Sequence, residues 1–365
     1  MKRKASSMLL VAVFLAVLFF PHILWNMFSA QIAGENSEKR TLAERPTFSL
    51  TEIEAYPKAY EEYYDDHLPF RDWMIKLYNS LQVRLFRTSS SRGVILGKEG
   101  WLFYSSQTDG TSLQCYDGSL LFTDEELAHI ADNLSSIQEK LAEQGTEFVV
   151  FIAPSKERIY SEYMPDYLGE PAEMCMVSQI MDYLHAHTNI RLVYPYEELV
   201  AYKEAHPQQL LYYRTDTHWN DLGAYVGTKA LLAELGIESV PLAQVDMTEK
   251  KNSKYDLASL LNVWGIHEDG VAKVVSAAGN EPKTLSYDYY GRSEYEMEGA
   301  PAFSLFMHND SFGAEMAKHL KYNLSHTLLM HHTEYKPEQI WAEKPDVFVL
   351  EVAERYIRRL RNPIL

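Results

Sequence analysis

The chain has few of the residues and patterns that would point to metal or redox chemistry. It contains only two cysteines, Cys115 and Cys175, and neither belongs to a CxxC pair or to a cluster of cysteine and histidine. We therefore expect no metal site. The sequence leaves open whether the two cysteines form a disulfide, which an even number allows outside the cytosol, or remain two buried thiols.

The chain is also poor in basic residues. Its 34 lysines and arginines are outnumbered by 51 aspartates and glutamates, which gives a net charge of −17. Such a surface repels the phosphate backbone of DNA and RNA, so we expect no nucleic-acid partner. We find neither an internal repeat nor a low-complexity segment. Length and composition fit one large globular domain or two modest ones.

One stretch near the N-terminus lacks charge altogether. Residues 8–25 contain no Asp, Glu, Lys or Arg, and basic residues occupy positions 2–4. A helix of this length spans roughly 27 Å, enough to cross a thin or average bilayer. A cleaved signal peptide is the alternative, but its apolar core is usually shorter, and no clean A-x-A site follows. We therefore expect residues 1–30 to form a cytoplasmic flank and a single membrane-spanning helix, with the rest of the chain outside the cytoplasm.

The region after this stretch predicts a stalk and then a folded domain. Residues 31–54 are polar and predict the stalk, and residues 55–365 the domain. Residues 55–86 carry large apolar residues at helical spacing, interrupted near Pro69, which predicts two helices or one kinked helix. Residues 93–104 contain two short apolar runs around glycines. This last pattern predicts a β-hairpin with its turn at the glycines.

From residue 123 onward, helical and strand patterns alternate. Thr123 and Glu126 have the spacing of a capping box, and the helix that they begin should stop at Gly145. Continuous apolar runs are typical of strands covered on both faces. Such runs occur at 147–154, 300–307, 326–330 and 346–352, and helical patterns at 220–235, 313–322 and 336–342. The alternation predicts an α/β fold with a mainly parallel sheet.

Three polar residues have the chemistry of a serine nucleophile and its base. Ser311 lies between a predicted strand and a predicted helix, where backbone N–H groups can stabilise an oxyanion. A serine hydroxyl needs a base to take its proton, and the base needs a third group to hold its tautomer. His218 and Asp216, two positions apart, fit these roles. Taken alone, Asp216 could instead cap the following helix, and His218 could be an ordinary hydrogen-bonded histidine.

Six short blocks of the sequence resemble a known family. They are similar to blocks of the SGNH-hydrolase-like O-acetyltransferase family of the alginate acetylation proteins AlgJ and AlgX, which has DHHW-type relatives in Gram-positive bacteria. The resemblance implies a three-layer α/β sandwich with a circularly permuted motif order, because the Asp/His pair precedes the serine. The blocks are YYDDHLPFRDW (63–73), GKEGWLFY (97–104), APSKERIYSEYMP (153–165), TDTHWNDLGAY (215–225), NDSFG (309–313) and PDVFVLEVAERY (345–356).

The resemblance also implies a function. It makes Ser311 the nucleophile, His218 the base and Asp216 the orienting acid. The enzyme would be an extracytoplasmic O-acyltransferase, and the acyl group that the resemblance implies is acetyl, which makes it an O-acetyltransferase. The enzyme would need no cofactor, would act through an acyl-serine on hydroxyls of a cell-surface or secreted polysaccharide, and would receive acyl groups from a membrane-bound O-acyltransferase. A carbohydrate acetyl-esterase with the same triad and a non-catalytic glycan-binding or assembly protein are the alternatives. One residue departs from the family pattern, because Asn309 stands where relatives often have glycine, and this puts close packing at the turn in doubt.

Four further residues are weaker candidates for substrate binding. Lys156 and Tyr160 follow the strand predicted at 147–154, and Arg355 follows the strand predicted at 346–352. The carboxyl ends of parallel strands meet at one edge, so these side chains could line the same cleft. Surface charge and a packed tyrosine are the alternative. Trp219 could stack on a sugar ring or pack beneath the loop that carries His218.

Overall fold

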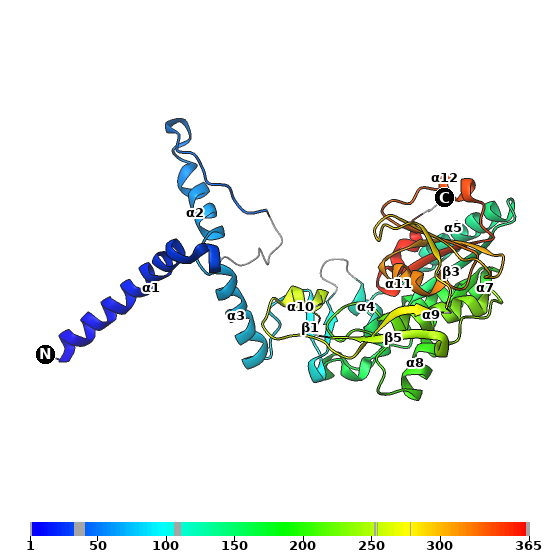
Figure 1. The fold of residues 1–365 in the computed structure, drawn as a ribbon, viewed down its shortest axis with the longest axis horizontal. Helices are drawn as coiled ribbons and strands as arrows, with labels where there is room; N and C mark the ends of the chain where they lie inside the picture. Colours follow the sequence, from blue (N-terminus) through cyan, green and yellow to red (C-terminus); the bar gives the residue numbers. More distant parts are fainter. Residues whose placement is uncertain are drawn as a thin grey trace. The chain divides into compact units, whose positions relative to one another are not determined.

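The computed structural model describes residues 2–32, 41–105, 111–251, 253, 255–277 and 279–362. The chain divides into two compact units (Figure 1). The first comprises Met1–Ser90 with Leu261–Gly265, and the second comprises Ser91–Leu260 with Ile266–Leu365. The boundaries predicted at residues 30 and 54 stay predictions, and residues 33–40 of the predicted stalk lie outside the described residues.

The first unit is helical. It contains α1 (Lys2–Ile32), the short η1 (Leu50–Glu52), α2 (Tyr56–Asp66) and α3 (Arg71–Leu85). The pattern near Pro69 therefore marks a break between two helices, and Phe70 before α3 adopts a left-handed φ of 61°. Within the described part of the chain, no helix has both the length and the apolar character needed to cross a membrane. The membrane-spanning helix predicted within residues 1–30 is thus not supported.

The second unit begins with the predicted hairpin. Strands β1 (Val94–Leu96) and β2 (Leu102–Tyr104) pair antiparallel around the turn η2 (Lys98–Gly100). Gly100 in the turn has a φ of +81°, which glycine adopts without strain. A Cβ on Gly97 would lie 2.6 Å from the Phe103 ring, so glycine is needed at this position for close packing.

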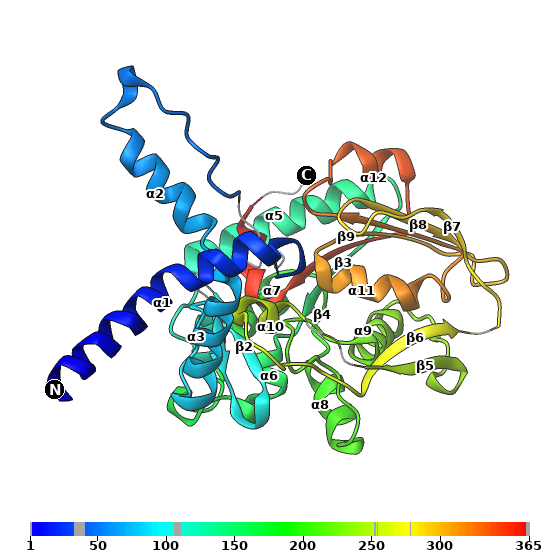
Figure 2. The same cartoon turned by 60° about the vertical axis from the view of Figure 1, so that its left-hand side comes forward.

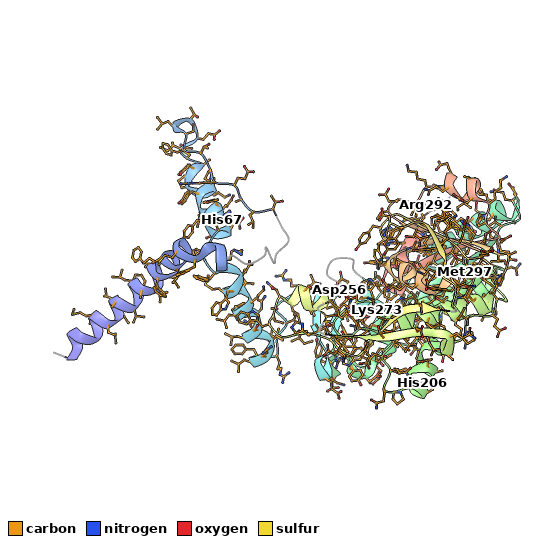
Figure 3. The ribbon with its side chains drawn as sticks, viewed as in Figure 1. His67, His206, Asp256, Lys273, Arg292 and Met297 are labelled. Atoms are coloured by element: carbon orange, nitrogen blue, oxygen red, sulfur yellow. The ribbon has the colours of Figure 1, made fainter. Side chains whose placement is uncertain are left out.

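A seven-stranded sheet forms the centre of this unit. Its order is β4-β3-β11-β9-β10-β8-β7, in which the first five strands are parallel and the last two are antiparallel. The sheet is therefore mixed: its five parallel strands agree with the mainly parallel sheet expected, and β8 and β7 add an antiparallel edge. The hairpin of β7 and β8 was not predicted because its residues are partly exposed and lack a continuous apolar run. The strands are β3 (Glu147–Ala153), β4 (Arg191–Val193), β7 (Lys283–Ser286), β8 (Arg292–Glu296), β9 (Ser304–Asn309), β10 (His326–His331) and β11 (Val347–Ala353). Figure 3 labels Arg292 at the start of β8.

Helices cover both faces of the sheet, which gives three layers (Figure 2). In β3, the side chains of Phe148, Val150 and Ile152 pack in one apolar cluster with α5 (Asp124–Ala142) and α7 (Met176–His187). The alternate side chains of β3 pack in a second cluster with α9 (Asp221–Glu234) and α11 (Ser311–Leu320). The continuous apolar run predicted for this strand is thus explained by burial on both sides.

The predicted cap and stop of α5 are confirmed. Thr123 and Glu126 form the reciprocal capping box, and Gly145 follows the helix with a φ of +79°. The two cysteines are free and buried, so the structure contains the two thiols rather than the disulfide. The remaining elements are α4 (Ser112–Asp117), α6 (Lys156–Ile159), η3 (Ser161–Tyr163), η4 (Asp166–Leu168), α8 (Tyr196–Ala205), η5 (Leu242–Gln244), β5 (Val245–Lys250), α10 (Asp256–Leu261), β6 (Val271–Ala277), α12 (Glu338–Glu343) and η6 (Glu354–Arg361).

Candidate active site

Ser311 lies at the carboxyl end of a strand in the middle of the sheet. Strand β9 runs between β11 and β10 and ends at Asn309, and Ser311 is the first residue of α11. Asp310 caps this helix, because its Oδ1 accepts the N–H of Phe312 at 2.8 Å and its Oδ2 accepts the N–H of Ala353 at 2.9 Å. The carboxylate therefore ties the helix start to the neighbouring strand β11 and fixes the position of the serine.

The structure brings His218 and Asp216 to this serine across 93 positions of sequence. His218 Nε2 lies 2.7 Å from Ser311 Oγ, and His218 Nδ1 lies 2.6 Å from Asp216 Oδ1. The same Oδ1 also accepts the backbone N–H of His218 at 3.0 Å. Asp216 does not cap α9, because Asn220 accepts the N–H groups of that helix's first turn. The geometry therefore matches a nucleophile, a base and an orienting acid.

A second carboxylate, which the sequence did not point to, supports this loop. Asp256 Oδ1 accepts the N–H of Thr217 at 2.9 Å, and Asp256 Oδ2 accepts the Thr217 hydroxyl at 2.7 Å. The backbone N–H of Asp256 donates to Asp216 Oδ2 at 3.0 Å. Figure 3 labels Asp256 among the side chains of this unit. No local signal in the sequence could have found it, because the contact joins segments that only the fold brings together.

The pKa values of the two carboxyl groups shift in opposite directions. Burial opposes ionisation of Asp216, but the hydrogen bond and charge of His218 outweigh it and lower the pKa of Asp216 to about 2. Burial and the charge of Asp216 raise the pKa of Asp256. Asp216, His218 and Asp256 lie close enough to hold a metal ion. Both ring nitrogens of His218 already have protein partners, and the expectation of no metal stays a prediction.

Lys156 holds the loop that carries Asp216 and does not reach the cleft. Its side chain is buried, and its ammonium donates to the backbone carbonyls of Tyr213 at 3.2 Å, Asp216 at 2.6 Å, and Leu102. On the other side of the loop, the Glu268 carboxylate accepts N–H groups of residues 214 and 215. Substrate binding, which the sequence had suggested for Lys156, does not fit this placement, because the ammonium is buried and its hydrogen bonds all go to backbone carbonyls.

Tyr160 and Trp219 are likewise part of the packing beneath the loop. The Tyr160 hydroxyl accepts the N–H of Leu211 at 2.9 Å, and both side chains are buried. The Trp219 indole N–H donates to the carbonyl of Phe312 at 3.2 Å, which connects the His218 loop to α11. Of the two alternatives for Trp219, the structure therefore favours packing, and neither ring is placed to contact a substrate.

A cavity of about 330 Å³ opens at Ser311 and His218. Among the four weaker candidates, only Arg355 lines it. The Arg355 guanidinium lies 5.2 Å from the centre of the Phe312 ring and 5.7 Å from that of Tyr104. Burial, followed by the charge of Arg359, lowers the pKa of His332 at the cavity wall to about 4. The cavity thus offers a cation and a neutral imidazole beside the serine.

The turn tolerates Asn309 without strain. Asn309 is the last residue of β9 and has no positive φ, so the position makes no demand for glycine. The close approach occurs at Gly313 instead, where a Cβ would lie 2.7 Å from Asn309 Cβ and 2.7 Å from Glu351 Oε2. Asparagine at position 309 therefore does not prevent close packing at the turn, because the residue that must be glycine is Gly313.

Comparison with known proteins places the chain in a family. The family described as SGNH hydrolase-like domain, acetyltransferase AlgX, matches residues 94–286, more than half of the chain. The chain belongs to this family. The matched region contains Asp216 and His218 but ends before Ser311. The inclusion of Ser311 in the candidate site therefore rests on its hydrogen bond with His218 and not on the family match.

Curated relatives agree with this assignment, and solved structures share the fold. The chain is 27% identical over 242 residues to the probable alginate O-acetylase AlgJ of Pseudomonas syringae pv. tomato, covering 66% of this chain and 54% of the relative. The chain thus spans about half the length of the curated relatives that it matches. The fold resembles Bacillus cereus PatB1 with a sulfonyl adduct (TM-score 0.54, 14% identity, 74% of this chain and 100% of that one). It also resembles a DHHW family protein from Eubacterium siraeum (TM-score 0.53, 14% identity, 76% and 97%).

Proposed function

We propose that this protein is an O-acyltransferase, most directly an O-acetyltransferase, that modifies hydroxyl groups of a polysaccharide through an acyl-serine on Ser311. One observation carries the proposal: the continuous pair of hydrogen bonds from Ser311 Oγ through His218 to Asp216, at 2.7 Å and 2.6 Å. Such a chain activates a serine for acyl transfer. The name of the AlgJ relatives, probable alginate O-acetylase, supports acetyl as the acyl group and a polysaccharide as the acceptor.

In the first step, Ser311 Oγ attacks the carbonyl carbon of the acyl donor while its proton moves to His218 Nε2. The bond between the carbonyl carbon and the donor's leaving oxygen then breaks, and His218 returns the proton to that oxygen. Asp216 holds the Nδ1–H of the imidazole and stabilises the imidazolium. The N–H of Ser311 lies at the start of α11, where helix N–H groups favour a developing negative charge.

In the second step, a sugar hydroxyl attacks the acyl-serine. His218 takes the proton of that hydroxyl and passes it to Ser311 Oγ, so the enzyme returns to its starting state and the sugar carries the ester. Water in place of the sugar would make the protein an acetyl-esterase. Ester formed on an added oligosaccharide, measured against acetate released, separates these two outcomes.

Acyl-serine formation is tested by intact-mass spectrometry of the full chain after incubation with p-nitrophenyl acetate. The wild type should gain one acetyl group, and Ser311→Ala should gain none. Ser155→Ala is the matched control, because Ser155 also follows a strand of the sheet but is the N-cap of α6 and does not line the cavity. Equal acetylation of the wild type and Ser311→Ala would overturn the assignment of the nucleophile.

The proposal includes a location outside the cytoplasm and a membrane-bound O-acyltransferase as acyl donor. The basic residues at 2–4 and the uncharged run at 8–25 support export. An exported enzyme cannot reach cytosolic acetyl-CoA, so a membrane partner must deliver the acyl group. A fusion of alkaline phosphatase after residue 90 should be active in cells, because that reporter works only after export. An inactive fusion that is stably produced would contradict the location.

A further inference from the structure

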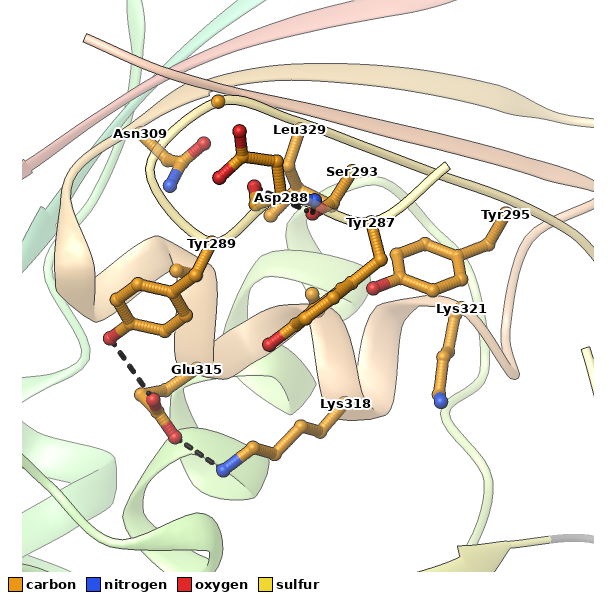
Figure 4. Close-up of a pocket in the computed structure, with 13 residues that line it drawn as sticks. Tyr287, Asp288, Tyr289, Ser293, Tyr295, Asn309, Glu315, Lys318, Lys321 and Leu329 are labelled. Carbon is orange, nitrogen blue, oxygen red and sulfur yellow. Dashed lines mark hydrogen bonds and ion pairs between the residues drawn. The ribbon is translucent and has the colours of Figure 1, made fainter. Parts of the chain in front are cut away.

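A second cavity lies beside the serine. Its volume is about 250 Å³, and it is formed between α11 and the loop at 287–291, which connects β7 to β8 (Figure 4). Tyr289 lines both this cavity and the one at Ser311. Its hydroxyl lies 3.2 Å from Glu315 Oε1 and 3.5 Å from the carbonyl oxygen of Ser311. The two cavities are therefore neighbours that share one wall.

One residue that lines this cavity carries an unpaired, buried hydrogen-bond acceptor. Asn309 is only 2% exposed, and its Nδ2 donates to the carbonyl of Asp310 at 2.7 Å. Among the described residues its Oδ1 has no partner. A buried acceptor left unpaired is costly, and native proteins satisfy nearly all such groups. Asn309 lines the cavity together with the Asp288 carboxylate, and Figure 4 shows both side chains on the same side of it. A hydroxyl donor in the cavity would satisfy the Asn309 oxygen.

Aromatic rings form the rest of the wall. Tyr287, Tyr289 and Tyr295 line the cavity, and in Figure 4 the Tyr287 ring extends between the other two. Tyr287 is 68% exposed, so a ligand can reach its ring from solvent. A sugar ring has apolar C–H faces that pack on an aromatic ring and hydroxyls that donate to buried acceptors. The volume is below the range of about 300–1,000 Å³ for drug-sized ligands, which fits a single ring.

We propose that this cavity is a subsite for one sugar residue of the acceptor polysaccharide, adjacent to the residue that is acylated at Ser311. In the subsite, a sugar hydroxyl donates to Asn309 Oδ1, and the sugar ring packs on Tyr287. The inference rests on the proposed function, because it assumes a glycan acceptor. It adds that the acceptor is held by at least two sugar units, one on each side of Tyr289.

The subsite is tested by calorimetric titration of the full chain with hexasaccharides of glucose, of mannuronate and of N-acetylglucosamine. At least one should bind. Tyr287→Ala and Asn309→Ala should each weaken that binding by about tenfold, the effect of losing one packed ring or one hydrogen bond. Tyr167→Ala is the matched control, because Tyr167 is 79% exposed on η4 and lines neither cavity. Thermal melting checks that Asn309→Ala is folded. Tyr287→Ala should leave the fold intact, because it changes an exposed side chain.

Acyl-serine formation from p-nitrophenyl acetate separates the two proposals, since that small ester does not need the subsite. Acylation together with binding that depends on Tyr287 supports both. Acylation with binding that is unchanged in folded Tyr287→Ala and Asn309→Ala, or with no hexasaccharide bound, overturns the subsite alone. Binding that depends on Tyr287 without any acylation overturns the catalytic proposal and keeps the subsite as a glycan-binding site.

Discussion

The backbone N–H of Asp256 donates a hydrogen bond to Asp216 Oδ2 at 3.0 Å. The other oxygen of Asp216 accepts both the backbone N–H and the ring Nδ1–H of His218. The orienting carboxylate is therefore itself oriented, because each of its oxygens has a fixed donor. An amide has only one oxygen, so replacing Asp216 by asparagine must set its NH₂ group against one of these donors.

Asp216→Asn should accordingly lower turnover by up to about 10⁴-fold while the protein remains folded. The substitution favours the wrong imidazole tautomer and removes the charge that stabilises the imidazolium. The measurement is the rate of acetyl release from p-nitrophenyl acetate, with circular dichroism to check the fold. Asp166→Asn is the control, because its side chain is 92% exposed on η4. Near-normal turnover of Asp216→Asn beside an inactive His218→Ala would refute the role of the carboxylate.

The pKa of Asp216 gives a pH prediction. Because His218 lowers this pKa from 3.8 to about 2, the carboxylate should remain ionised well below pH 3.8. Its contribution to folding stability is fully present above the unfolded pKa of 3.8 and is lost as pH falls through about 2. The hydrogen-bonded imidazole Nδ1 proton, observed at low field by NMR, should persist from neutral pH to below pH 3.8. Loss of that signal near pH 4 in a protein that is still folded would contradict the shift.

Central strands of the sheet and one of its covering helices could be predicted from the sequence because they depend on local signals. The apolar runs of β3 and β11 reflect burial on both faces, and the capping box at Thr123 starts α5. Asp256 and Glu268 could not be predicted, because each acts through hydrogen bonds to a loop distant in sequence. Nothing in the sequence indicates that Lys156, which follows β3, turns inward.

Lys156→Met tests whether that lysine supports the loop or binds substrate. The ammonium donates to the carbonyls of Tyr213 and Asp216, and methionine would leave these carbonyls buried and unpaired. We expect the free energy of unfolding to fall by about 3 kcal/mol, with a lower kcat because the His218 loop loses its anchor. The measurements are urea unfolding and steady-state kinetics, with Lys229→Met on the exposed surface of α9 as control. A raised KM with unchanged stability would restore the substrate-binding interpretation.

Gly223 in the first turn of α9 should resist even a methyl group. A Cβ there would overlap the carbonyl oxygen of Leu211 and lie 2.9 Å from Trp219 Cβ, beside His218. Alanine improves helix propensity by about 1 kcal/mol, but overpacking against backbone typically costs about 1–3 kcal/mol. The loop carbonyl cannot rotate away as a side chain could, because residue 211 also accepts the N–H of Asn220 at 2.8 Å.

We therefore expect Gly223→Ala to lower the free energy of unfolding by about 1 kcal/mol, the overpacking cost less the propensity gain, and to slow acyl-serine formation, because Trp219 shifts with its neighbour His218. Urea unfolding and the rate of acetylation by p-nitrophenyl acetate measure the two effects. Gly93→Ala is the matched control, since a Cβ there meets its nearest atoms at 3.7 Å and 3.9 Å, which is ordinary contact. If Gly223→Ala is as stable and as active as Gly93→Ala, the loop carrying His218 accommodates the added methyl group, and the prediction is wrong.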